Sequence, residues 1–175
     1  ADPRPLTGLN SPSDELAPVF GAGSLLFASD RPGGAGRLDL WFAPYSQGEF
    51  GRATAFAPGL NSAADETDPA PVPGTRSLVF ASDRARADLD LYVATPDASG
   101  FFVPEALDAL NSPQEEREPT FSGDPRSLLF ASDRAGGAGA FDLYRALCFD
   151  GGWSAPTPLR ELNTAYSERG PGLAV

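Results

Sequence analysis

Carboxylates and guanidinium groups recur at matching positions along this chain. The segment Ser-Leu-Leu-Phe-Ala-Ser-Asp-Arg occupies residues 24–31, returns with one Val for Leu at 77–84, and is repeated unchanged at 127–134. A further Asp opens the apolar run that follows each copy. Asp can cap a turn and Arg can pair with a carboxylate, so these side chains could form a repeated polar network. The recurring residues are Asp30, Arg31 and Asp39, then Asp83, Arg84 and Asp90, then Asp133, Arg134 and Asp142.

We interpret these recurring residues as a structural network rather than as a catalytic site. In repeat proteins the scaffolding residues recur from unit to unit, whereas functional residues tend to be individual. The expected arrangement is that each Asp caps the turn after its segment and each Arg pairs with a carboxylate of the same or the next unit.

The units that must position these residues are about fifty residues long. A Leu-Asn pair marks the boundaries, and it occurs at Leu9-Asn10, Leu60-Asn61, Leu110-Asn111 and Leu162-Asn163. We therefore divide the single domain 1–175 into units at 10–60, 61–110 and 111–162, with a partial fourth repeat at 163–175. A period of this length is typical of propellers and solenoids.

Each unit reads as four strands. The first follows a Pro, the second is the repeated segment, the third starts at its Asp, and the fourth starts at an aromatic residue. These aromatic residues are Phe50, Phe101 and Trp153, each eleven residues after the Asp of the third strand, which predicts a constant hairpin. Leu25 and Phe27 should face one side of the second strand, and Leu26 and Ala28 the other. A strand that is apolar on both faces must lie inside a stack of sheets.

Composition agrees with a turn-rich all-β protein and limits its chemistry. The chain of 175 residues has 19 Gly and 18 Pro, which favour turns over long helices. It has no His, and all its cations are Arg, so the commonest general base and the Schiff-base amine are missing. The net charge of −11 disfavours nucleic acid and anionic lipid as partners and favours cations or basic partners. No apolar run has the length of a membrane span, and Cys148 is expected to be a strand residue.

The repeated motifs together resemble the TolB-type WD-like β-propeller repeat. The resemblance rests on the acidic pair before Pro, on Leu-Leu-Phe-Ala-Ser-Asp-Arg, on Gly-Gly-Ala-Gly and Asp-Leu-Trp/Tyr, and on Leu-Asn at the end. The second unit departs from it, because residues 84–90 lack the glycines and are two residues shorter. The resemblance implies four-stranded antiparallel propeller blades and a secreted, periplasmic or envelope-associated binding module.

Three blades cannot close a propeller, because closed rings have about four to eight blades. Two chains arranged head to tail would give six, so we expect a homodimeric six-bladed ring. The ends complicate this expectation: residues 4–9 resemble the end of a fourth strand and residues 168–175 resemble a first strand, so the junction is written twice.

One glutamate opens the first strand of each unit and of the partial fourth repeat. In a propeller, this first strand lines the central channel. These glutamates are Glu15, Glu66, Glu116 and Glu168. In a closed ring their carboxylates would converge at one mouth, where Ca²⁺ or Na⁺ could bind. The alternative is that each carboxylate pairs with an Arg or caps a backbone turn.

Our prediction of function is a non-catalytic module without a cofactor that binds an envelope protein or a glycan on a ring face. One alternative is a structural or oligomerisation fragment of a longer propeller. Another is a propeller enzyme that hydrolyses glycosides with two carboxylates from different blades.

Overall fold

The computed structural model describes residues 3–57, 59–150 and 152–172, and it contains no helix within them. The prediction of an all-β chain is confirmed. Three antiparallel sheets follow one another along the chain. Sheet 1 consists of β1 (Glu15–Gly21), β2 (Ser24–Ser29), β3 (Asp39–Ser46), β4 (Glu49–Phe50) and β5 (Thr54–Ala55). Sheet 2 consists of β6 (Glu66–Pro71), β7 (Leu78–Ser82), β8 (Asp90–Pro96) and β9 (Phe102–Ala106). Sheet 3 consists of β10 (Glu116–Phe121), β11 (Ser127–Ser132), β12 (Asp142–Phe149), β13 (Gly152–Trp153) and β14 (Thr157–Pro158).

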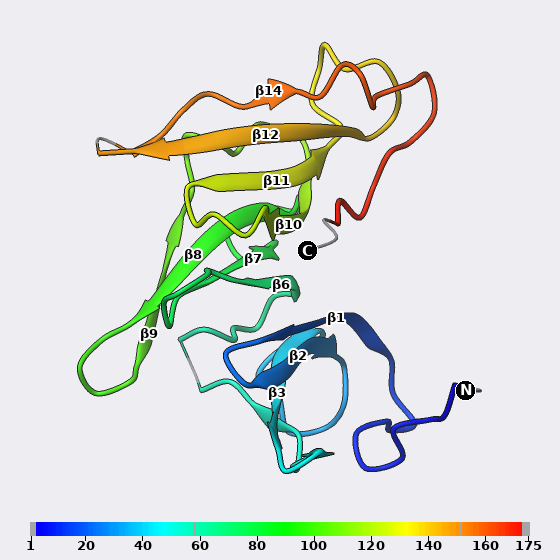
Figure 1. Cartoon of the computed structure of the whole chain (residues 1–175), viewed down its shortest axis with the longest axis vertical. Helices are drawn as coiled ribbons and strands as arrows, with labels where there is room; N and C mark the ends of the chain where they lie inside the picture. Colours follow the sequence, from blue (N-terminus) through cyan, green and yellow to red (C-terminus); the bar gives the residue numbers. More distant parts are fainter. Residues whose placement is uncertain (1–2, 58, 151, 173–175) are drawn as a thin grey trace.

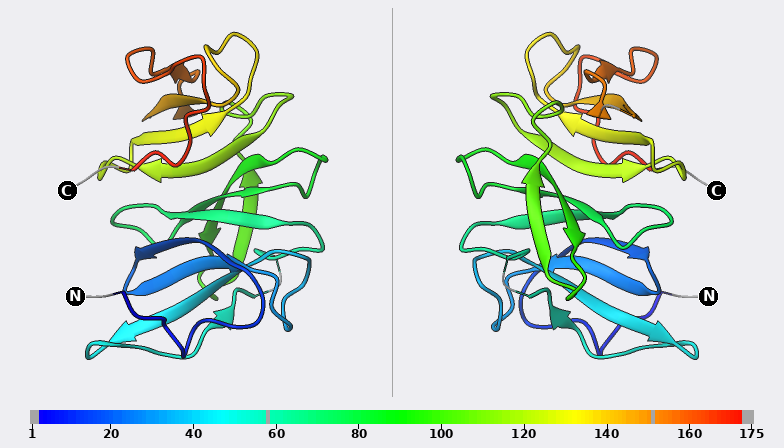
Figure 2. Two further views of the ribbon diagram at one scale, coloured as in Figure 1. Left: turned by 90° about the vertical axis from the view of Figure 1, so that its right-hand side faces the viewer. Right: turned by 90° about the vertical axis from the view of Figure 1, so that its left-hand side faces the viewer.

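The sheets are stacked along the longest dimension of the molecule. Figure 1 shows sheet 1 in blue and cyan at one end, sheet 2 in green in the middle, and sheet 3 in yellow and orange at the other end. Within each sheet the first four strands pair in sequence order, and in sheets 1 and 3 a fifth strand, β5 or β14, pairs with the third. The side views of Figure 2 show the same order of sheets.

Sheet 2 is apolar on both faces, as the continuous apolar run of its second strand predicts. Leu78 and Phe80 pack with Leu26 and Ala28 of sheet 1 in one buried cluster. Val79 and Ala81 face the other way, into a second cluster that includes Leu128 and Phe130 of sheet 3. The period of two along a strand therefore places each apolar set in a different interface between sheets.

The first strand of every sheet contains a β-bulge at the same place. In sheet 1 the ladder skips from Leu16 to Val19, and Ala17 adopts a φ of 48°. Asp68 and Glu118 occupy the equivalent positions with φ of 52° and 53°. Each of the three precedes a Pro, whose nitrogen cannot donate to the ladder, so the pairing breaks there.

The predicted constant hairpin between the third and fourth strands is wrong for sheet 2. In sheets 1 and 3 the strands join after two residues, and Phe50 and Trp153 pair with the third strand. In sheet 2 the partner of Pro96 is Phe102, and Phe101 lies in the loop. The longer loop closes on Asp97, whose side chain accepts hydrogen bonds from the backbone N–H of Ser99 and Phe101.

The two segments that repeat the junction contain no strand within the described residues. Residues 3–14 and 159–172 form turns and irregular backbone, and residues 173–175 lie outside the described part. Residues 168–172 therefore do not form the first strand that their sequence resembles. Among the described residues, none forms a helix with the length and apolar character needed to cross a membrane.

Candidate functional site

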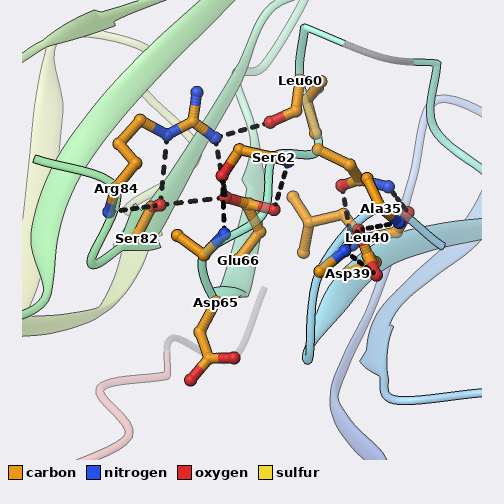
Figure 3. A network of polar contacts seen from close by, with 12 residues as sticks. Ala35, Asp39, Leu40, Leu60, Ser62, Asp65, Glu66, Ser82 and Arg84 are labelled. Atoms are coloured by element: carbon orange, nitrogen blue, oxygen red, sulfur yellow. Dashed lines mark hydrogen bonds and ion pairs between the residues drawn. The ribbon is translucent and has the colours of Figure 1, made fainter.

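The repeated Arg and the glutamate of the first strand belong to one polar network. In sheet 2, shown in Figure 3, the Arg84 Nη2 lies 3.0 Å from Oε1 of Glu66 and 2.5 Å from the backbone oxygen of Leu60. The hydroxyl groups of Ser62 and Ser82 donate to the same carboxylate oxygen at 2.6 and 3.1 Å. The other oxygen accepts the backbone N–H of Ser62 at 2.8 Å. Glu66 is fully buried, so these bonds replace its hydration.

The same arrangement occurs in the other two sheets. Nη2 of Arg134 lies 2.9 Å from Oε1 of Glu116 in sheet 3, and Nη2 of Arg31 lies 2.8 Å from Oε1 of Glu15 in sheet 1. Each Arg also stacks over two aromatic rings of the second and third strands, at 4.8 to 5.2 Å from the ring centroids. Cation–π stacking fixes the guanidinium plane above the strands. The network therefore ties the segment before each sheet to its second strand.

Burial distinguishes the glutamates of these networks. Burial raises the pKa of Glu66, although hydrogen bonds from Ser62 and the charge of Arg84 act in the opposite direction. Burial also acts to raise the pKa of Glu15, but the bonds from Ser11 and Arg31 outweigh it and the pKa is lowered. The difference follows exposure, because the Glu15 side chain is 23 % exposed and that of Glu66 is fully buried.

The Asp that precedes each Arg holds the turn before the first strand. Oδ1 of Asp83 accepts the backbone N–H of Asp65 at 2.7 Å. Asp30 and Asp133 accept the corresponding N–H groups of Asp14 and Glu115 at 3.0 and 2.9 Å. The bonds of these aspartates thus reach back 16 to 18 residues. The sequence predicted that these aspartates cap the turn after the repeated segment, but their hydrogen bonds go to the turn before the first strand.

The Asp of the third strand is the residue that holds that loop. In sheets 1 and 3 Asp39 and Asp142 accept backbone N–H groups of the Gly-Gly-Ala-Gly loops, from Ala35 and Ala138 at 3.0 and 2.9 Å. Asp90 in sheet 2 has no such loop, and it pairs with the side chain of Arg86 instead. The shorter second loop therefore replaces backbone donors with a guanidinium group.

The glutamates do not converge on a common centre. Glu15, Glu66 and Glu116 each bind the Arg of their own sheet, and Glu168 accepts hydrogen bonds from the N–H and hydroxyl of Thr164. Among the described residues no three acidic or Cys side chains are grouped closely enough to hold a metal ion. The Ca²⁺ or Na⁺ site at these four residues was predicted for the mouth of a closed ring, so it stays a prediction.

Two other acids lie at the hollow between the first strands. A cavity of about 780 Å³ is lined by residues of β1, β6 and β10, and Asp68 and Glu118 are its only acidic residues. The backbone N–H of Glu118 donates to Asp68 at 3.2 Å, and that of Gly170 donates to Glu118 at 2.5 Å. Arg169 pairs with Glu118 at 2.8 Å. Each bulge acid therefore binds residues at the equivalent position of the following repeat.

Asp68 and Glu118 are not among the site residues predicted from the sequence. The available signal was their position directly before a repeated Pro, where Ala17 and Gly170 stand in the first and fourth copies. Burial raises the pKa of Asp68, and the nearby charge of Glu118 contributes in the same direction.

A scan of the chain against models of known protein families gives no match, and a search among curated proteins finds no similar sequence.

Proposed function

We propose that the three sheets are blades of a β-propeller and that two chains close into a six-bladed ring. The observation that carries this proposal is the position of the exposed apolar side chains. Of the large hydrophobic residues that are exposed in the described part of the chain, only Phe101 and Val103 lie in the fourth strand of sheet 2 or in the loop before it. The others lie on the end sheets or their flanking segments, and they are Leu6, Leu16, Phe20, Tyr45, Phe149, Leu162 and Tyr166.

Phe20 illustrates why a further sheet is expected beside sheet 1. It pairs with Leu25 as Phe121 pairs with Leu128 in sheet 3. Phe121 packs in the interface between sheets 2 and 3, whereas Phe20 is 56 % exposed and contacts Tyr45 at a centroid distance of 5.7 Å. An aromatic pair of this kind is a candidate anchor for a neighbouring blade.

The free side of sheet 3 is the surface that Phe20 of a second chain would meet. It carries Leu129, together with Arg145 at the position that Phe42 and Val93 hold in the other sheets. In a ring, Arg145 would lie near the aromatic pair of the next chain, where a cation–π contact suits it.

Light scattering coupled to size exclusion tests ring closure. We expect a particle of about twice the chain mass of 18.3 kDa. Phe20→Asp should reduce it to the monomer, because a charge would be buried in the interface. Val103→Asp is the matched control, because Val103 is exposed to the same degree on the outer strand of sheet 2. A wild-type monomer, or equal behaviour of the two variants, would contradict the ring.

For activity we propose a non-catalytic binding module that works outside the cytoplasm and recognises a protein or a glycan on one ring face. The loop 97–101 supports this assignment of a face, because it is longer than its counterparts and presents Phe101, which is 49 % exposed. The first test is a glycan array. Binding lost in Phe101→Ala and kept in Val103→Ala would support a glycan ligand, and equal loss in both variants would contradict the loop's role.

A further inference from the structure

An apolar cavity of about 570 Å³ lies between sheets 1 and 2. It adjoins the hollow between the first strands, and Gly21, Ala22, Pro71 and Thr75 line both. Its walls include Phe42 and Phe56 on the side of sheet 1, and Leu78 and Phe102 on the side of sheet 2. The Phe56 ring lies 5.0 Å from that of Phe42 and 5.7 Å from that of Phe102, between centroids. A concave apolar site of this volume is typical for a small organic ligand.

Two positions in the lining of the cavity carry smaller residues than their counterparts in the next interface. They are Gly21 and Pro71, which are in close contact, because a Cβ on Gly21 would lie 2.5 Å from the Pro71 ring. At the equivalent positions of the interface between sheets 2 and 3 the chain has Val72 and Phe121, and both pack against the buried core there. Larger side chains thus fill these positions between sheets 2 and 3, whereas a cavity lies beside them between sheets 1 and 2.

The cavity has a single charged residue in its lining, Arg76. Within the described residues Arg76 forms no ion pair, although the chain carries a net charge of −11 and most of its arginines are close to acids. Ser24, Thr54 and Ser77 also line the site. An Arg beside an apolar cavity favours a ligand that combines an apolar body with an anionic group.

We propose that this cavity binds a small aromatic carboxylate, with its ring among Phe42, Phe56 and Phe102 and its carboxylate on Arg76. Offset and edge-to-face contacts with three phenyl rings suit a flat aromatic body. All the residues that line the cavity belong to one chain, so the site does not depend on ring closure.

Calorimetric titration with 2-naphthoate tests the site. We expect saturable binding of one molecule per chain, and binding about tenfold weaker for the neutral analogue 2-naphthalenemethanol, because a hydrogen-bonded charge pair is lost. Arg76→Gln should weaken naphthoate binding by a similar factor. Arg126→Gln is the matched control, because Arg126 precedes Ser127 as Arg76 precedes Ser77 but does not line the cavity.

Filling the cavity is the second arm of the test. Pro71→Phe places at this interface the residue that fills its counterpart, so it should abolish binding while the melting temperature shows that the chain still folds. If this variant fails to fold, the pair of Arg variants decides alone. The proposal is overturned by absence of saturable binding to the wild type, by equal affinity of the two Arg variants, or by full binding to a folded Pro71→Phe.

Discussion

Single residues of the repeated network differ in how much stability they carry, because their burial differs. Arg84 and Arg31 make the same bonds, but the glutamate beside Arg84 has no exposed surface and the glutamate beside Arg31 is partly hydrated. An unpaired buried carboxylate costs more free energy than an exposed one. We therefore expect removal of the network Arg to lower the free energy of unfolding more in sheets 2 and 3 than in sheet 1.

Arg84→Ala should lower the free energy of unfolding by about 3 kcal/mol or more, because it leaves Glu66 buried without its cation. The matched variant Arg31→Ala should cause a smaller loss, since water can reach Glu15. Urea unfolding of both variants measures the difference. The double variant Arg84→Ala, Glu66→Gln should recover part of the loss, and equal losses in the two single variants would contradict this account.

Asp68 should make stability depend on pH in the mildly acidic range. Burial raises its pKa above the ordinary value of 3.8, so the folded chain binds this proton more tightly than the unfolded chain. The contribution of this group to stability is therefore present below about pH 3.8 and is lost as the pH rises through the folded pKa. Asp68→Asn cannot lose a proton, and its amide oxygen can still accept the N–H of Glu118.

Unfolding of Asp68→Asn and the wild type at several pH values tests the titration of Asp68. The stability of the variant relative to the wild type should increase with pH across this window, since the titrations common to both proteins cancel. The exposed Asp108→Asn serves as control for the removal of one carboxylate. A constant difference between Asp68→Asn and the wild type would exclude the proposed titration.

At the scale of elements, the loops between the second and third strands supply hydrogen-bond donors to the same buried Asp in two ways. The glycine loops of sheets 1 and 3 turn backbone N–H groups toward Asp39 and Asp142, and a Cβ on Gly34 or Gly137 would clash with that carboxylate. Sheet 2 uses Arg86 and needs no glycine there. The second unit thus keeps the Asp as hydrogen-bond acceptor, and the side chain of Arg86 replaces the backbone N–H groups as donor.

Gly36→Ala should destabilise sheet 1 by about 1–3 kcal/mol, because its Cβ would lie 2.3 and 2.6 Å from the backbone oxygens of Ala64 and Ser62. Backbone atoms cannot rotate away as a flexible side chain can. Gly8→Ala is the control, since nothing lies within 4 Å of its Cβ position and its φ is not positive. Thermal unfolding measures both variants, and a neutral Gly36→Ala would show that the loop shifts without cost.

At the scale of the whole molecule, the apolar surface of the end sheets links folding to assembly. If two chains bury Phe20 and its neighbours in a ring, mass action stabilises the folded state at higher protein concentration. The melting temperature of the wild type should therefore rise with concentration, and that of Phe20→Asp should not. A concentration-independent melting temperature in the wild type would argue against a ring held together by this surface.

Much of the architecture could be predicted from local patterns. The Leu-Asn period, the uninterrupted apolar run Leu25–Ala28 and the turn residues depend on neighbours in sequence, so they indicated the strands and the apolar character of both faces. The recurrence of Asp30, Arg31 and Asp39 indicated a polar network for the same reason. The hairpin of sheet 2 could not be predicted in this way. Phe101 has the same spacing from Asp90 as its counterparts in the other units, but Pro96 pairs with Phe102 instead.

The sequence by itself determined an all-β chain with a repeated polar network, because these features follow from residue types and spacing within one unit. Only the tertiary structure decided that each Arg selects the glutamate 16 to 18 residues earlier, and that Asp68 and Glu118 share the hollow of the first strands. It also decided that a cavity lined by Gly21 and Pro71 lies between sheets 1 and 2. These outcomes depend on distances between residues brought together by packing, and such distances are set by how whole sheets fit against one another.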